Sequence, residues 1–341
     1  MAVPTVTSDG TLVPDGSTRP AAPATGRRAL LLKLGRLALS LAIAASITYF
    51  VVQLWPEVEP YLASLSAPII IGSLLAALAG MAANVMAWHA VLRELDHDVP
   101  VLESGRIYLV GQLGKYLPGS VWAFVMQMEL SRRAGVPRAR AFAGSLVLVG
   151  LSTTAAVLVG ILGIPALVDA GGSAVWAIAA LAPIALVCAL PPVLSRLVDL
   201  FLRILRRPGL GHRLTARGLA PVIGWSVVAW FCFGTQLWLL SLGAAPSGAD
   251  SWLRAVGAFA LAMTAGLLAV VAPSGLGARE AVLVAGLAPV TGAGTALGIA
   301  LASRLVFTVA DVIAAGAAAL SARHALDGYT PSTDGAPATS T

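Results

Sequence analysis

The chain has 341 residues, of which 58% are hydrophobic and 11% are charged, and its formal net charge is +6. Apolar runs of about 18 residues or more recur along it, the pattern of helices that cross a membrane. This composition excludes an ordinary soluble globular protein, and the lack of short alternating segments excludes a transmembrane β-barrel. We therefore expect an all-α polytopic membrane protein.

Both ends of the sequence are rich in small and polar residues. Pro, Thr, Ala, Gly and Ser dominate residues 1–26 and 325–341, and we expect both to be disordered tails. Between them lies one expected membrane domain, residues 27–324. Its first apolar run, 35–55, is too long for the h-region of a signal peptide, and no small-residue cleavage site follows it. We interpret this run as the first membrane helix.

The hydropathy pattern predicts six full spans, at about 35–55, 68–91, 141–165, 173–193, 221–243 and 292–320. Basic residues cluster before and at the start of the first span: Arg19, Arg27, Arg28, Lys33 and Arg36. The positive-inside rule therefore predicts a cytoplasmic N-terminus. With two further apolar segments treated as hairpins, the C-terminus is also cytoplasmic. If the arm 252–272 crosses the membrane fully, the C-terminus lies outside instead.

The first of these segments, 105–131, is interrupted by Pro118 and Gly119. Proline costs a helix interior about 3 kcal/mol and glycine about 1 relative to alanine, so two half-helices joined by an unwound turn are expected. The following loop, 131–140, carries four arginines: Arg132, Arg133, Arg138 and Arg140. It stays cytoplasmic only if the segment returns to the face it entered. We predict a re-entrant hairpin.

The second segment, 252–290, contains a similar break after Pro273, 155 residues beyond Pro118. With this offset, each half of the chain is a span, a Pro/Gly-broken hairpin and a span, at about 68–165 and 221–320. The two halves start on opposite faces, which makes them an inverted repeat. Inverted repeats with interrupted segments in matching positions are typical of transporters with a site near the bilayer midplane.

The segment 194–217 joins the two halves and is strongly basic. Its arginines are Arg196, Arg203, Arg206, Arg207, Arg213 and Arg217. Several recur at helical spacing opposite apolar residues such as Leu197 and Phe201, which predicts an amphipathic helix on the anionic cytoplasmic leaflet. We interpret it as an orientation anchor; a lipid-headgroup sensor is the alternative.

Charged side chains at bilayer depth cost about 2.5–3.5 kcal/mol each, so those near the breaks are candidate functional groups. Half-helix N-termini also favour anions, and we predict that Lys115 and Arg279 neutralise a phosphate there. The predicted substrate-binding residues are Lys115, Tyr116, Pro118, Gly119, Ser274, Gly275, Gly277, Arg279 and Glu280. The predicted structural charges, which pair with others to hold the hairpins, are Glu129, Arg304 and Asp311. For Arg279 and Glu280, the alternative to substrate binding is the same structural role.

Two motifs, GQLGKYLPGSVW at 111–122 and APSGLGAREA at 272–281, resemble the signature regions of the lysylphosphatidylglycerol synthase transmembrane family. The resemblance covers about residues 35–320 and implies a flippase-like integral membrane domain. In the best-known members this domain is fused to a soluble domain that aminoacylates phosphatidylglycerol, and it moves the lysyl lipid to the outer leaflet. Other members stand alone or accompany the handling of polyprenyl-phosphate sugars. Few residues follow the last expected span, so we expect no aminoacyl transfer.

We therefore expect a multi-pass protein of the bacterial cytoplasmic (inner) membrane that translocates or binds an anionic lipid. The lipid would be a phosphatidylglycerol derivative or carry a polyprenyl-phosphate-linked headgroup. The alternatives are a membrane-embedded enzyme and an accessory scaffold in envelope lipid or glycan synthesis. The sequence contains no catalytic motif, metal-ligand spacing or nucleotide loop, so we expect no enzyme activity, cofactor or metal. Expected partners are anionic lipids and a lipid-modifying enzyme or glycosyltransferase, not nucleic acid.

Overall fold

The computed structural model divides the chain into two units, Met1–Ala44 and Ala45–Thr341, and every element described below belongs to the second. The described residues are 58–117, 121–163, 174–204, 213–245, 247–268 and 277–327, with residue 209 and isolated positions between 34 and 56. The predicted tails, 1–26 and 325–341, lie outside this set except for 325–327, which continue the last helix.

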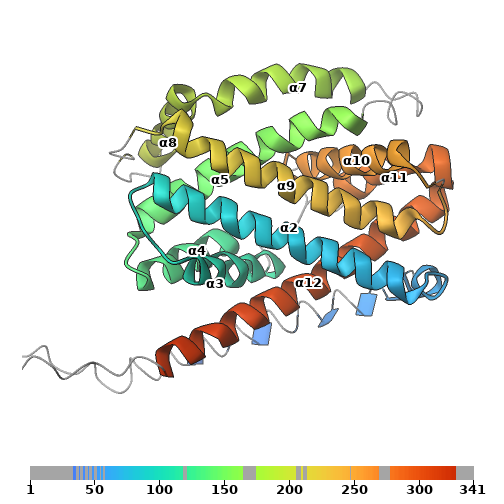
Figure 1. Cartoon of the computed structure of the whole chain (residues 1–341), viewed down its shortest axis with the longest axis horizontal. Helices are drawn as coiled ribbons and strands as arrows, with labels where there is room; N and C mark the ends of the chain where they lie inside the picture. Colours follow the sequence, from blue (N-terminus) through green and yellow to red (C-terminus); the bar gives the residue numbers. More distant parts are fainter. Residues whose placement is uncertain are drawn as a thin grey trace, which may run out of the picture. The chain divides into compact units, whose positions relative to one another are not determined.

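All the regular structure in the described residues is helical, as the composition predicts (Figure 1). In chain order the elements are α2 (Ala67–Glu94), α3 (Val101–Gln112), the 3₁₀ turn η1 (Leu113–Tyr116), α4 (Trp122–Arg133), α5 (Arg138–Gly160), the 3₁₀ turn η2 (Ile161–Gly163), α7 (Ala174–Ala189), α8 (Pro191–Ile204), α9 (Ala216–Ser241), α10 (Ala249–Leu268), α11 (Ala278–Thr291) and α12 (Ala293–Asp327).

Four helices are long and apolar enough to cross a membrane: α2, α5, α9 and the Ala293–Ser321 part of α12. They match four of the six predicted spans. The predicted span 35–55 lies mostly outside the described residues. The predicted span 173–193 is not one helix: α7 has 16 residues, and the chain bends by 84° between its described second half and α8, which starts at Pro191. Taken together, α7 and α8 supply at most a fifth, broken span.

The first Pro/Gly-interrupted segment consists of two short helices, as predicted, although residues 118–120 are not described. Leu117 has extended backbone angles (φ −81°, ψ 145°), the conformation that a following proline favours. Gly111 lies against Gln127, and a Cβ at Gly114 would lie 2.6 Å from the backbone nitrogen of Ala123. These contacts show that α3 with η1 runs antiparallel to α4 at very short range, so the two helices form a hairpin.

The second interrupted segment has the same form. α10 and α11 pack together on either side of residues 269–276, which are not described. Gly286 of α11 lies against Ala258 of α10, so the two helices approach closely. Gly277 begins α11 with a positive φ of 89°, a conformation that glycine adopts far more easily than other residues. The break therefore ends at a residue whose backbone needs glycine.

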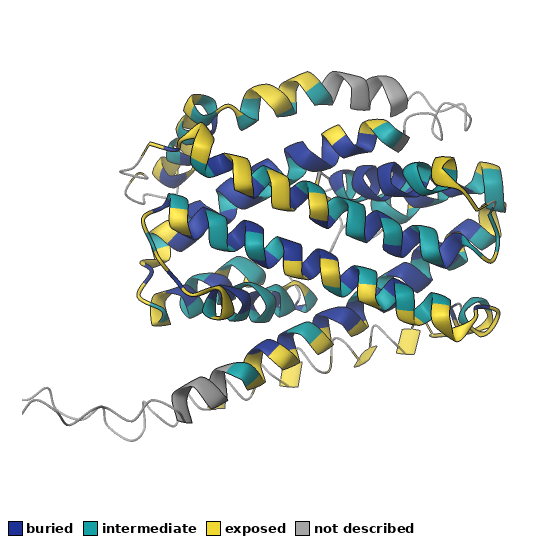
Figure 2. Cartoon of the chain, viewed as in Figure 1, coloured by how far each residue is buried: buried dark blue, intermediate teal, exposed yellow. Residues whose placement is uncertain are grey.

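The two halves of the chain meet along α2 and α9, which lie side by side and antiparallel (Figure 1). Glu94 at the end of α2 accepts a hydrogen bond from the Thr215 N–H before α9, and Phe233 lies beside Gly80 near both midpoints. The packing is also reciprocal. α5 packs against α9 and α10 of the second half, while α12 packs against α2 and α3 of the first. Figure 2 shows buried residues concentrated in α5 and α10, inside the bundle.

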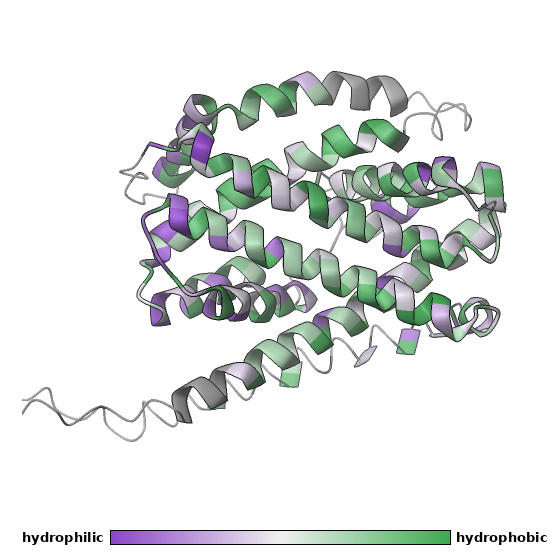
Figure 3. Cartoon of the chain, in the orientation of Figure 1, coloured by the Kyte–Doolittle hydropathy of each residue, from purple (hydrophilic) through white to green (hydrophobic). Residues whose placement is uncertain are grey.

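One end of the bundle brings the basic loop 131–140 and the residues before α9 together with the acidic loop after α2. Arg140 donates to the Leu95 carbonyl after α2, and Glu94 binds Thr215 before α9, so three loops meet there. Hydrophilic segments concentrate at this end in Figure 3, whereas the helix bodies are hydrophobic. The outward surfaces of the long helices expose apolar side chains such as Leu75, Val228 and Val312, as contact with lipid requires. The protein is an all-α membrane protein.

Candidate functional site

The apolar part of helix α12, Ala293–Ser321, carries two buried charges. Arg304 and Asp311 are seven residues apart, which is about two helical turns, so they lie on the same face. The side chains are 13% and 6% exposed, respectively. Groups buried to this extent need counter-charges, and each pairs with a residue at the tip of one hairpin.

Asp311 binds the first hairpin just before its break. The Lys115 Nζ lies 2.6 Å from Asp311 Oδ2, and the Tyr116 hydroxyl donates a hydrogen bond of 2.7 Å to the same oxygen. Both partners belong to η1, whose tight turn directs consecutive side chains toward α12. The Lys115 side chain is 43% exposed, so its ammonium group remains accessible from outside the ion pair.

Arg304 binds the second hairpin just after its break. The Glu280 Oε1 lies 2.8 Å from Arg304 Nη1, and Glu280 Oε2 accepts a hydrogen bond of 2.8 Å from the Gly277 N–H. Glu280 therefore caps the first turn of α11 and pairs with α12 at the same time. An acid at this position also suits the positive end of the helix dipole.

Arg279 lies against two aromatic rings that stack on each other. Its guanidinium carbon is 5.3 Å from the ring centroid of Phe259 and 5.7 Å from that of Phe307, which is cation–π range. One terminal nitrogen is buried and has no hydrogen-bond partner within the described part of the chain. Arg279 also interacts electrostatically with Arg304 and Glu280.

The five charged groups near the breaks do not balance. Lys115, Arg279 and Arg304 are cationic, whereas Glu280 and Asp311 are anionic. The group thus has a net positive charge inside an apolar bundle. Such an arrangement attracts an anion, because a further negative charge would complete the neutralisation.

Glu129, the third predicted structural charge, lies elsewhere. It pairs with Arg132, Arg133 and Arg138, in and beside the basic loop 131–140. Hydrogen bonds from Arg132 and Arg138 lower the pKa of its carboxyl group to about 2. Glu129 thus ties the end of α4 to the start of α5, away from the charges on α12.

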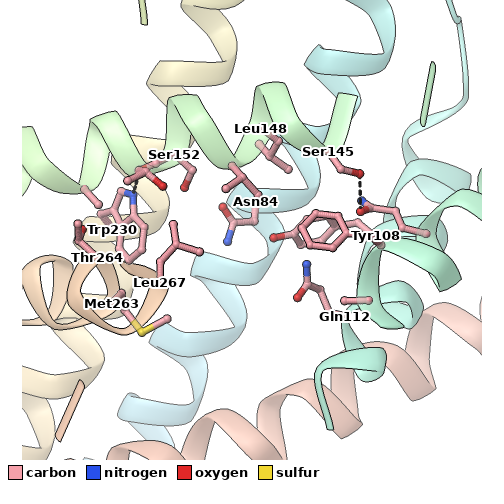
Figure 4. A pocket seen from close by; sticks show the side chains of 16 residues that line it. Asn84, Tyr108, Gln112, Ser145, Leu148, Ser152, Trp230, Met263, Thr264 and Leu267 are labelled. Carbon is pink, nitrogen blue, oxygen red and sulfur yellow. Dashed lines mark hydrogen bonds between the residues drawn. The ribbon is translucent and has the colours of Figure 1, made fainter. Parts of the chain in front are cut away.

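A cavity of about 320 Å³ lies between the two hairpins (Figure 4). Its walls come from α2, α3, α4, α5, α9 and α10, so both halves of the chain contribute. Most of its polar groups are neutral side chains of the first half: Asn84, Tyr108, Gln112, Gln127, Ser145, Ser152 and Thr153. None of the described residues that line it is charged. Gln112 precedes Lys115 by one turn, so the cavity adjoins the charged group.

The predicted substrate-binding residues divide by whether the structure describes them. Lys115 and Tyr116 meet at Asp311, and Gly277 and Glu280 meet at the start of α11 beside Arg279. The other four lie outside the described residues: Pro118, Gly119, Ser274 and Gly275. Substrate binding by these nine residues stays a prediction.

Sequence reasoning did not assign the cavity residues to a site. The available signal was the recurrence of amide and hydroxyl side chains in apolar helices, as at Asn84, Gln112 and Gln127. Each is common as a helix–helix hydrogen bonder, and spacing alone does not show that they face one space. For metal ions, no group of three or more His, Cys, Asp or Glu side chains within the described residues is arranged to hold one.

Comparison with known proteins gives one family match. The family model described as the lysylphosphatidylglycerol synthase TM region matches residues 37–315, which include both hairpins and both buried charges of α12. No curated protein matches the sequence.

Proposed function

Because the chain belongs to the lysylphosphatidylglycerol synthase TM region family, we propose that it is a flippase-like protein that binds an anionic lipid and moves it across the membrane. One observation carries this proposal: the two helix breaks are attached to one face of α12, through Lys115–Asp311 and Glu280–Arg304, with a net positive charge between them. A lipid phosphate is the anion that a membrane supplies in greatest abundance to such a site.

The proposed architecture is an inverted repeat with two re-entrant hairpins and six spans. The antiparallel packing of α2 with α9 and the reciprocal packing of α5 and α12 on the opposite halves support this arrangement. Broken segments in matching positions are the usual elements of a midplane transport site. The first hairpin can be tested with cysteines at Glu103 and Arg133 in a chain whose Cys188 and Cys232 are replaced. A membrane-impermeant thiol reagent should label both positions from the same side.

The lipid phosphate would bind between Lys115 and the start of α11. The Lys115 ammonium supplies a mobile charge, the first N–H groups of α11 supply hydrogen-bond donors, and Arg279 supplies a fixed charge. In the structure the Lys115 ammonium forms an ion pair with Asp311, which a lipid phosphate would have to replace. The turns at Pro118–Gly119 and Ser274–Gly275 would let the phosphate approach the backbone closely, because glycine has no side chain to exclude it.

The proposed orientation places the basic end of the bundle and both termini in the cytoplasm, in a bacterial inner membrane. The arginines of loop 131–140 and those beside the start of α9, Arg213 and Arg217, support it, because both groups lie at this end of the bundle. We propose a carrier rather than an enzyme, working beside a lipid-modifying enzyme or a glycosyltransferase that supplies its lipid. Transport would follow alternate exposure of the site as one half rocks against the other.

Leaflet-resolved labelling in reconstituted vesicles tests this function. Vesicles containing phosphatidylglycerol with a fluorescent label on one acyl chain are prepared with the full chain, with its Lys115→Gln variant, or without protein, and the label in the outer leaflet is quenched at intervals. The wild-type chain should make the inner pool accessible, and Lys115→Gln should slow this step. Arg106→Gln, an arginine paired with Glu103 on the same hairpin, serves as the control. Equal rates with and without protein would refute the transport function.

A further inference from the structure

Most of the surface of the cavity between the hairpins is apolar, but several amide and hydroxyl side chains also line it, and none of its described lining residues is charged. Its amide and hydroxyl side chains come mainly from α2, α3, α4 and α5, and its apolar walls include Phe124 and Trp230. Residues 118–120 and 269–276, which lie outside the described residues, include no Asp or Glu. The cavity therefore offers a ligand hydrogen bonds and aromatic contact, but no counter-ion for an ammonium group.

Several of these polar groups are available to a ligand. Within the described residues, the side chains of Asn84, Tyr108 and Gln112 make no hydrogen bond to another protein group. Figure 4 shows the three side chains facing one another across the cavity. Amides and a phenol both donate and accept, so a ligand hydroxyl is complementary to each of them.

Gln127 provides an independent observation. Its side chain is 5% exposed, and its Oε1 accepts a hydrogen bond of 2.9 Å from the Ser145 hydroxyl. The Nε2 of the same amide is buried and has no partner among the described residues, although the residue lines the cavity. A buried donor left unsatisfied costs about 1–3 kcal/mol, so this group is expected to have a partner in the working protein.

We propose that this cavity binds the uncharged, hydroxyl-rich headgroup of the transported lipid, such as a glycerol or a single sugar. This proposal rests on the proposed function: the lipid phosphate lies at Lys115, and the headgroup beyond it reaches Gln112 and the cavity. The volume suits one small headgroup, since it is at the lower end of the range of about 300–1,000 Å³ for ligand pockets. The same space disfavours a cationic aminoacyl headgroup, because none of the described residues that line it carries a carboxylate to pair with a buried ammonium.

The test compares three lipids with identical acyl chains: phosphatidylglycerol, lysyl-phosphatidylglycerol and phosphatidic acid. Dissociation constants are obtained from the concentration dependence of the melting temperature of the full chain in detergent micelles. Wild type should bind phosphatidylglycerol about tenfold more tightly than either competitor, the effect of one or two added hydrogen bonds to buried amides. Binding is measured without transport, so the two proposals can fail separately.

Gln127→Met should reduce the preference for phosphatidylglycerol over phosphatidic acid by about fivefold or more, with little change in the affinity for phosphatidic acid. Asn84→Leu should also reduce this preference. It provides a second test of the cavity if Gln127→Met fails to fold. Gln236→Met is a matched control. Gln236 is also fully buried, accepts a 3.0 Å hydrogen bond from Ser303 and has an unpartnered Nε2, but it does not line the cavity. It should leave the preference unchanged.

Each other outcome has a definite meaning. Equal binding of phosphatidylglycerol and phosphatidic acid by wild type would overturn the headgroup proposal and leave phosphate recognition intact. Tighter binding of lysyl-phosphatidylglycerol would overturn it in favour of a cationic headgroup. If both Gln127→Met and Asn84→Leu keep the preference for phosphatidylglycerol over phosphatidic acid, the cavity does not recognise the headgroup. A melting temperature that none of the three lipids shifts would refute both proposals.

Discussion

The carboxylate of Glu280 and the guanidinium of Arg304 lie 2.8 Å apart, and each side chain is only 13% exposed. Breaking a buried pair by removing one charge destabilises a protein by about 3–5 kcal/mol, because the remaining charge stays in an apolar environment. Glu280→Gln should therefore lower the free energy of unfolding by about this amount. The measurement is chemical unfolding in micelles, followed by tryptophan fluorescence.

Two further variants test whether the loss of the buried ion pair causes the destabilisation of Glu280→Gln. Replacing both residues by methionine should recover most of the loss, since a buried pair and an apolar pair of similar volume are close in stability. Glu103→Gln breaks the more exposed pair with Arg106 and should cost about 1 kcal/mol at most. Equal destabilisation by Glu280→Gln and Glu103→Gln would show that the α11–α12 pair does not hold the second hairpin.

Opposite effects on lipid binding are expected from the two partners at the first break. Asp311→Asn removes the anion that competes with a phosphate for Lys115 but keeps an oxygen that can accept from Tyr116. It should tighten phosphatidylglycerol binding by about threefold to tenfold, the weight of one partly exposed ion pair. Lys115→Gln should weaken binding by a similar factor. Weaker binding in both variants would mean that Asp311 helps to hold the lipid.

Close packing of the first hairpin depends on Gly114. A Cβ there would lie 2.6 Å from the backbone atoms of Trp122 and Ala123, which cannot move aside as a flexible side chain can. Gly114→Ala should lower the free energy of unfolding by about 1–3 kcal/mol or more through overpacking. Gly224→Ala in α9 is the control, because nothing lies within 4 Å of its added Cβ. It should be neutral or stabilise by up to about 1 kcal/mol.

The arginines around Glu129 predict a pH dependence of stability. Hydrogen bonds from Arg132 and Arg138 lower the pKa of Glu129 from 4.5 to about 2, so folding favours the ionised form. The resulting stabilisation is fully present above about pH 4.5 and is lost as the pH falls toward about 2. The melting-temperature difference between wild type and Glu129→Gln should stay constant from about pH 7 to 5 and shrink below about pH 4. A constant difference at all these pH values would contradict this assignment.

Local chemistry made the helix breaks predictable. Pro118 stops a helix through covalent geometry, and the structure accordingly separates η1 from α4. The long apolar runs likewise predicted α2, α5, α9 and α12. The predicted span 173–193 was wrong as a single helix, because hydropathy is additive and does not register that Pro191 begins a new helix at a sharp angle.

Long-range contacts were not predictable in the same way. Tyr116 and Asp311 are 195 positions apart, and nothing in their local patterns identifies them as partners. The cavity poses the same difficulty. Asn84, Tyr108 and Gln127 belong to three different helices, and only the packing of those helices determines which side chains face a common space.

Because Arg304 and Asp311 share one face of α12, the two hairpins have a common point of attachment. Turning this helix by a single residue position, about 100°, would move both charges away from their partners together. Neither hairpin could then be released by that rotation while the other stayed fixed. Access to the site from the two faces of the bilayer would therefore be coupled directly through α12, because both hairpins are bound to this one helix.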